Sequence, residues 1–120
     1  MKVIISNGHC KFILGTVAEE LHKRSLLTLF ITAGYPTPIV SFLVRTFARS
    51  SKGAARLLDR KESIPNSLVR TMWLSEFIQK LAGLLFPYGS PKRYPLYGFS
   101  LALYSWKASI LIKKTNADIY

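Results

Sequence analysis

The sequence predicts an α/β fold: a partial Rossmann-like parallel sheet with flanking helices. Two observations support this prediction. The first 32 residues change their apolar period from strand to helix and back across a glycine turn. Later apolar segments with helical spacing are separated by loops rich in proline, glycine and serine. At 120 residues, the length allows one domain. Two strands, a few helices and the start of another strand make that domain an incomplete one.

The first unit begins with Val3, Ile4 and Ile5, which are β-branched and predict a short buried strand. The turn formers of residues 6–8 end that strand. From Cys10 to Arg24, apolar residues at helical spacing predict a helix whose stripe is Phe12, Ile13, Val17 and Leu21, with Ala18 beside them. Residues 26–32 then predict a second strand. A strand, a helix and a strand form a βαβ unit, so we expect the two strands to be parallel.

Further elements follow along the chain. Pro38 opens a helix that should run from Ile39 to about Arg49, with so many apolar residues that it is either well buried or lies against a membrane surface. The next residues predict a short helix at 54–60 and an extended segment at 68–72. Two longer helices follow: one at 73–86 with the apolar stripe Phe77, Ile78, Leu81 and Leu85, and one at 96–114 with an apolar face of Phe99, Leu103, Trp106, Ile110 and Leu111. A strand is predicted to begin at Ala117.

A candidate binding site lies at the turn after the first strand. Ligands of open α/β sheets bind beyond the carboxyl ends of the strands, where helix N-termini favour anions. Gly8, His9 and Lys11 are therefore the candidate binding residues. The turn has one glycine rather than the three of a dinucleotide fingerprint. The alternative interpretation is that Gly8 only allows the chain to turn tightly.

Composition limits the kinds of partner and chemistry. The formal charge of +11, from 17 Lys and Arg against 6 Asp and Glu, favours an anionic partner. The basic residues are dispersed and no nucleic-acid-binding motif is present, so we expect no nucleic acid partner. A single cysteine, Cys10, excludes an intrachain disulfide. No residue pattern predicts a catalytic triad, a metal site or a cofactor site.

The sequence shows neither a secretory signal nor a clean membrane span. The first apolar run stops after Ile5, which is too short for a signal-peptide core. The most apolar window, Leu96 to Ile112, contains Lys107 and several serines, whereas a spanning helix needs about 20 largely apolar residues. We expect a cytoplasmic protein. If it associates with a membrane, we expect it to be peripheral on the inner face of the cytoplasmic membrane.

Four passages resemble the N-terminal half of a family 4 retaining glycosyltransferase with the GT-B fold. Residues 2–12 resemble the first strand and its glycine loop, and residues 18–27 with Gly34-Tyr35-Pro36 resemble the first helix, the second strand and the loop after it. Residues 64–70, with Glu76 beyond, are similar to the isoleucine-proline passage of these enzymes. Ala117-Asp118-Ile119-Tyr120 is similar to the strand before a functional histidine.

This resemblance implies a two-domain enzyme that transfers a sugar from a nucleotide-sugar donor to a saccharide or lipid-linked acceptor. The N-terminal domain receives the acceptor, and Gly8, His9 and Lys11 would face the cleft between the domains. The donor and the catalytic groups belong largely to the second domain, so no catalytic residue is assigned here. Residues 1–120 are then the acceptor side of that enzyme, an N-terminal fragment that is inactive alone.

The alternative is a small basic protein that binds membrane surfaces and has no catalytic activity. Its basis is the charge of +11 together with apolar helices that carry Trp73, Trp106 and several tyrosines. This alternative predicts binding to anionic vesicles through the helices at 39–49 and 96–114. The binding should weaken with salt, because screening shortens the reach of the basic residues.

Overall fold

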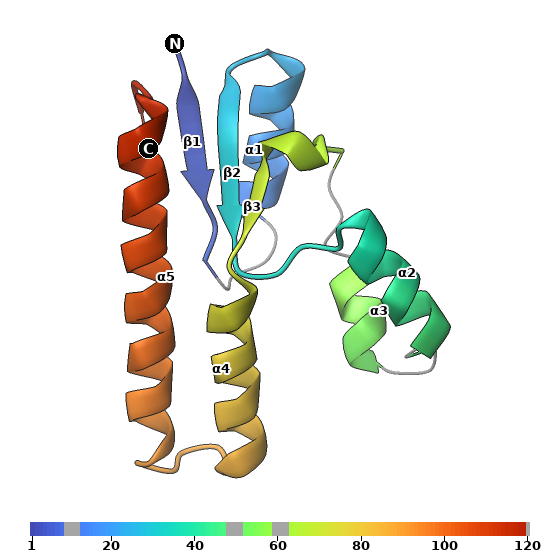
Figure 1. Ribbon diagram of the computed structural model, residues 1–120, viewed down its shortest axis with the longest axis vertical. Helices are drawn as coiled ribbons and strands as arrows, with labels where there is room; N and C mark the ends of the chain where they lie inside the picture. The colour runs from blue at the N-terminus through green and yellow to red at the C-terminus, as the bar shows by residue number, and fades with distance from the viewer. Residues whose placement is uncertain (9–12, 48–51, 59–62, 120) are drawn as a thin grey trace.

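The computed structural model describes residues 1–8, 13–47, 52–58 and 63–119. Three parallel strands form a sheet with helices on both faces (Figure 1), so the predicted α/β class is confirmed. In chain order the elements are β1 (Val3–Ser6), α1 (Ile13–Lys23), β2 (Leu27–Thr32), α2 (Pro38–Phe47), α3 (Lys52–Leu58), the 3₁₀ turn η1 (Asn66–Leu68), β3 (Val69–Thr71), α4 (Trp73–Leu85) and α5 (Arg93–Thr115).

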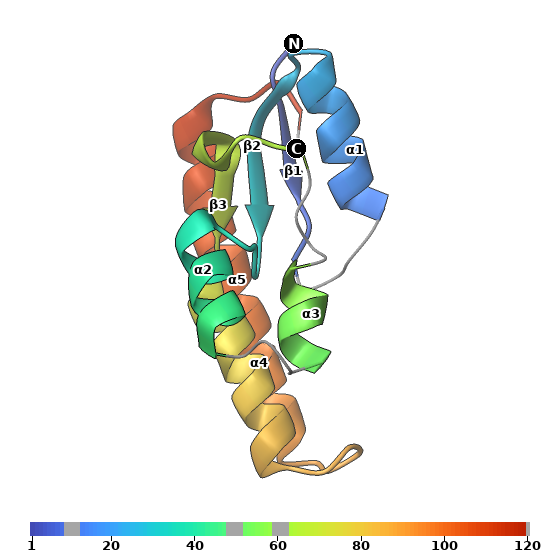
Figure 2. The ribbon, with the colours of Figure 1, turned by 90° about the vertical axis from the view of Figure 1, so that its right-hand side faces the viewer.

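The sheet has the strand order β1-β2-β3, with β2 in the centre. Phe30 of β2 pairs with Ile5 on one side and with Val69 on the other, and both pairings are parallel. Helix α1 lies on one face of the sheet and α5 on the other, as the two views show (Figures 1 and 2). The predicted βαβ unit of residues 2–32 is therefore confirmed.

Each face of the sheet carries its own core, because both faces are covered. The core toward α5 consists of Ile4, Leu29, Ile31, Ala33, Met72, Tyr104 and Ala108. The core toward α1 consists of Ala18, Leu27, Phe30, Tyr35, Ile64 and Val69. The successive residues Phe30 and Ile31 of β2 enter opposite cores, as the period of two in a strand requires. Burial of β2 on both faces explains its continuous apolar run.

Helix α1 buries small residues rather than the large stripe that the sequence predicted. Its buried residues are Gly15 and Ala18, while Ile13 is 78% exposed and Val17 is 39% exposed. These two residues of the predicted apolar stripe are therefore not part of the core. Small side chains allow the helix backbone to approach the sheet closely, which turns the larger neighbours at other angles of the helix toward solvent.

The C-terminus of α1 is closed by a Schellman motif. The Ser25 N–H donates to the His22 carbonyl over 2.9 Å, and the Leu26 N–H donates to the Leu21 carbonyl over 2.9 Å. Ser25 therefore has a left-handed backbone with a φ of 57°. This conformation favours glycine, because any Cβ is strained there.

Replacing Ser25 by glycine should stabilise the protein by about 1 kcal/mol, since glycine removes the left-handed strain of a residue with a Cβ. Urea unfolding of the S25G variant measures this gain. Serine at residue 63, also exposed, is a control position where a glycine should give no gain. A loss of stability in S25G would contradict the assignment of the motif.

Helices α2 and α3 lie together to one side of the sheet (Figure 1). Pro38 is the first residue of α2, as the sequence predicted. Of the two predicted environments for this helix, deep burial is wrong, because no residue of α2 is buried. Ile39, Phe42 and Phe47 are 67 to 81% exposed.

Helices α4 and α5 form an antiparallel hairpin that extends past the ends of the strands (Figures 1 and 2). The predicted segment at 68–72 is strand β3, and the predicted helix at 73–86 is α4. Helix α5 begins at Arg93, so the predicted start of this helix at residue 96 was three residues too late. Pro95 is tolerated there because the first turn of a helix leaves its N–H groups without helical partners. None of the helices in the described part of the chain is long and apolar enough to cross a bilayer.

The last described residues return to the sheet beside β1. Ile119 pairs with Val3 in a parallel bridge, and the Ile4 N–H donates to the Ile119 carbonyl over 2.9 Å. The Asp118 carboxylate accepts a hydrogen bond from the Lys2 N–H over 2.6 Å. The strand predicted to begin at Ala117 is thus present as a single bridge in the described residues, and Tyr120 lies outside them.

Candidate functional site

The carboxyl ends of the three strands meet at one edge of the sheet, and the loops there are joined by backbone hydrogen bonds. The Asn7 N–H donates to the Ile31 carbonyl over 2.8 Å, and the Ala33 N–H donates to the Gly8 carbonyl over 2.9 Å. The Met72 N–H lies 2.9 Å from the Thr32 carbonyl and 3.0 Å from that of Ala33. We call this the carboxyl edge. It is the edge at which open α/β sheets bind ligands.

Gly8 lies at the carboxyl edge with a left-handed backbone, at a φ of 54°. The turn therefore requires the conformation that the sequence predicted, one that glycine adopts at little cost. A Cβ at residue 8 would meet no atom of the described residues within 4 Å. Among the described residues, the space beside Gly8 is thus open on the side where a side chain would project.

Tyr104, on the face of the sheet that α5 covers, holds this turn in place through its hydroxyl. Its hydroxyl accepts a hydrogen bond from the Gly8 N–H over 2.9 Å and donates one to the Ile31 carbonyl over 3.1 Å. The hydroxyl also lies 2.9 Å from Ser6 Oγ. Because a tyrosine hydroxyl has one proton and Ile31 receives it, the Ser6 hydroxyl is the donor in that pair. One side chain thereby joins the end of β1, the Gly8 turn and the end of β2.

Burial raises the pKa of the Tyr104 hydroxyl above its ordinary value of 10.0, while the hydrogen bonds from Ser6 and Gly8 act in the opposite direction. The rise has a simple cause, because a phenolate loses its hydration in an apolar core. Tyr104 therefore keeps its proton at physiological pH, and its hydroxyl can act as donor and acceptor in these hydrogen bonds.

Glu76 approaches the carboxyl edge from the first turn of α4. Its side chain is buried, and its carboxylate forms an ion pair with Lys80 at 3.2 Å. A negative charge near a helix N-terminus is favourable, because the N-terminal N–H groups carry partial positive charge. The carboxylate lies against Gly34, in the loop after β2. A Cβ at residue 34 would overlap Glu76 Oε2 and lie 2.8 Å from Glu76 Cδ.

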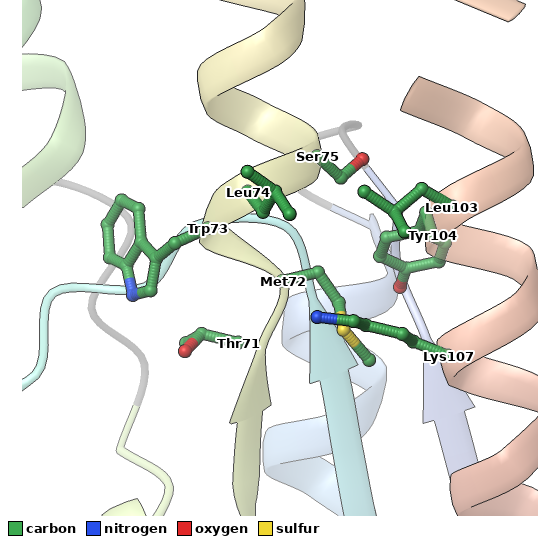
Figure 3. Close-up of a pocket in the computed structure, with 8 residues that line it drawn as sticks. All are labelled: Thr71, Met72, Trp73, Leu74, Ser75, Leu103, Tyr104 and Lys107. Atoms are coloured by element: carbon green, nitrogen blue, oxygen red, sulfur yellow. The ribbon is translucent and has the colours of Figure 1, made fainter. Parts of the chain in front are cut away.

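A pocket of about 210 Å³ opens beside this edge, between the start of α4 and the middle of α5 (Figure 3). It is lined by Thr71, Met72, Trp73, Leu74, Ser75, Leu103, Tyr104 and Lys107. In the close-up, the Lys107 amine lies near Met72, and the Trp73 ring points away from α5. The pocket combines an apolar wall with one cation, which suits an amphipathic or anionic group better than a purely polar one.

The described residues include only one of the three predicted site residues. Gly8 is at the carboxyl edge, as expected, whereas His9 and Lys11 lie outside the described residues. In the described part of the chain, no three His, Cys, Asp or Glu side chains are grouped so that they could hold a metal ion.

Sequence reasoning did not identify Tyr104, Gly34 or Glu76 as parts of this edge. Tyr104 lies 96 residues from Gly8, so no local pattern connects them. Gly34 and Glu76 were noted only as parts of the family resemblance. The signal that could have found Glu76 is an acidic residue in the first turn of a helix that follows a predicted strand.

No protein-family model, curated protein or solved structure matches the chain, so the site stands on its own geometry.

Proposed function

We propose that residues 1–120 are the acceptor-side part of a retaining glycosyltransferase of the GT-B fold, related to family 4. In this proposal a nucleotide-sugar donor is bound by a second domain, and a saccharide or lipid-linked acceptor meets the carboxyl edge of the domain described here. The observation that carries the proposal is the parallel sheet whose carboxyl edge gathers Gly8, Gly34 and the start of α4. The residue resemblance over most of the chain supports the same assignment.

The overall charge of the chain agrees with such a role. A glycosyl transfer from a nucleotide sugar releases a diphosphate, and positive potential stabilises the developing charge. The chain supplies a formal charge of +11. No atom of the described residues fills the space where a side chain at residue 8 would project, and Tyr104 holds the turn in place. Because the turn is already fixed, binding of an acceptor would cost less conformational entropy.

The test compares two substitutions at Gly8 in a continuous protein that also carries the donor-binding domain. Valine disfavours the left-handed backbone strongly, whereas asparagine adopts it more readily than other residues with a Cβ. Gly8→Val should lower kcat/KM for the acceptor at least about tenfold, since small displacements of reacting groups can cost roughly 100-fold. Gly8→Asn should stay within about threefold of the parent, because it keeps the turn.

Two controls make this test specific. Urea unfolding of both variants checks that the domain stays folded, so that a loss of turnover reports on the turn. Hydrolysis of the donor without acceptor should change little, because the donor is assigned to the other domain. Unchanged turnover and stability in Gly8→Val would contradict the site assignment. If the longer protein transfers sugar but Gly8→Val has no effect, the glycosyltransferase assignment would stand and the assignment of the acceptor site to the Gly8 turn would be wrong.

A further inference from the structure

The α4–α5 hairpin carries large apolar side chains on its outer surface. Leu74, Leu81 and Leu85 of α4 recur at intervals that place them along one side of that helix, and they are 38 to 59% exposed. Phe99, Leu103 and Trp106 of α5 also recur along one side, with Phe99 and Trp106 about 60% exposed and Leu103 half-buried. We call these six residues the hairpin apolar face.

The two rows belong to one surface. Leu74 and Leu103 line the same pocket, where the rows meet (Figure 3). The helices pack against each other through small residues instead. Ser75 and Ser100 are buried, with Ser75 Oγ 2.9 Å from the Ser100 carbonyl and Ser100 Oγ 2.7 Å from the Ser75 carbonyl. Leu74, Leu85, Phe99 and Trp106, by contrast, are each more than half exposed.

The charge of the hairpin indicates what covers this face. Residues 73–116 contain Lys80, Lys92, Arg93, Lys107, Lys113 and Lys114, and their one acidic residue is Glu76. Glu76 is buried and paired with Lys80, so it offsets little of the exposed positive charge. Lys107 lines the pocket together with Leu74 and Leu103, which places a cation beside the apolar rows.

We propose that the hairpin apolar face docks on the surface of a bilayer that contains anionic lipids. Apolar side chains would enter the boundary between headgroups and acyl chains, and the lysines would contact lipid phosphates. Trp106 suits this boundary, because an aromatic ring with a polar N–H is apolar at one end and hydrated at the other. A second copy of the chain fits less well, since two hairpins with the same excess of positive charge would repel each other. This inference goes beyond the proposed function and does not depend on sugar transfer.

The first experiment is sedimentation of the whole chain with vesicles of phosphatidylcholine alone or with one quarter phosphatidylglycerol. We expect binding to the anionic vesicles at least about tenfold stronger than to neutral ones, falling at high salt. The double variant F99S/W106S should lose about tenfold or more of that binding, because it removes two large apolar side chains from the face. The triple variant K107Q/K113Q/K114Q should lose a similar amount and reduce the salt dependence.

Matched controls lie elsewhere on the molecule. I13S/V17S removes two exposed apolar side chains from α1, on the opposite face of the sheet (Figure 2), and should bind like the parent. I39S/F42S tests α2, which is also exposed, and should lose less binding than F99S/W106S. A larger loss from the α2 variant than from the hairpin variant would overturn the proposal.

A second experiment reports the position of the face directly. With Trp73 replaced by phenylalanine, Trp106 is the one remaining tryptophan, and its emission should be quenched by lipids brominated on their acyl chains. Binding without quenching of Trp106 would contradict the proposal. Equal binding to neutral and anionic vesicles would do so too. A lipid-free dimer that F99S/W106S dissociates would assign the face to a second copy of the chain and overturn membrane docking.

Discussion

Replacing Tyr104 by alanine should lower the free energy of unfolding by about 4 kcal/mol, the range found for removal of a large aromatic side chain from a core. Tyr104 is 7% exposed and packs in the core between the sheet and α5. The substitution also removes the hydroxyl that accepts from the Gly8 N–H. Urea unfolding followed by circular dichroism measures the loss.

The variant Tyr104→Phe separates the hydroxyl from the ring. It keeps the packing and removes three contacts, to Ser6, Gly8 and Ile31. The loss should be about 1–2 kcal/mol, because the Ile31 carbonyl still accepts from the Asn7 N–H while the Gly8 N–H loses its partner. A Tyr104→Phe variant as stable as the parent would show that the hydroxyl does not hold the turn.

The raised pKa of Tyr104 adds a dependence on pH. Below the ordinary tyrosine pKa of about 10, both the folded and the unfolded protein keep the proton, so stability is unaffected. Above that pH the unfolded chain loses the proton first, and stability falls as the pH rises toward the folded-state pKa. Tyr104→Phe should remove this part of the alkaline loss, while the other tyrosines remain.

Replacing Gly34 by alanine should cost about 2 kcal/mol, since the new methyl group would occupy space already filled. Its Cβ would overlap Glu76 Oε2 and lie 3.1 Å from Trp73 Cζ3, so the buried carboxylate has to move. A double-mutant cycle isolates this contact. In a Glu76→Ala background the same Gly34 substitution should cost much less, because the overlap with Glu76 is gone and only the 3.1 Å approach to Trp73 Cζ3 remains.

Gly98→Ala is a matched control for this cycle. Gly98 lies in α5, and a Cβ there would meet no atom within 4 Å. Alanine at that position should be neutral or stabilise the helix by up to about 1 kcal/mol. If Gly34→Ala costs as much without Glu76 as with it, the contact between the loop after β2 and α4 is wrongly assigned.

Local features of the fold were predictable from the sequence because local residues determine them. The β-branched run from Val3 to Ile5 forms β1, and Gly8 has the positive φ that its place in a turn indicated. Pro38 begins α2, as its fixed φ favours. The parallel pairing of β1 and β2 followed from the change of period between them.

The orientation of the helices could not be predicted in the same way. Apolar spacing shows which residues share a side of a helix, but not whether that side faces the core or the exterior. In α4 and α5, Ser75, Ser100 and Ala108 are buried while Phe77 and Phe99 are exposed. Small residues allow close approach of two helices, and a hydrophobicity pattern gives them little weight.

The candidate site was predictable only at Gly8. Tyr104 and Glu76 reach the carboxyl edge because of tertiary packing between distant segments, and the hydrogen bond from Gly8 to Tyr104 spans 96 residues. Conformational preferences act over a few residues, so they carry no information about such contacts. His9 and Lys11 remain predictions, since they lie outside the described residues.

The central proposal, an acceptor-side domain of a glycosyltransferase, is tested most directly by a turnover assay on two proteins. One is the chain of residues 1–120, and the other is a continuous protein that joins it to a donor-binding domain. Each is incubated with a panel of nucleotide sugars and with saccharide and lipid-linked acceptors. We expect transfer by the longer protein and none by residues 1–120 alone, because donor and acceptor have to be held in one geometry by two domains. Transfer by residues 1–120 at an ordinary enzyme rate of about 1 s⁻¹ or more would contradict it.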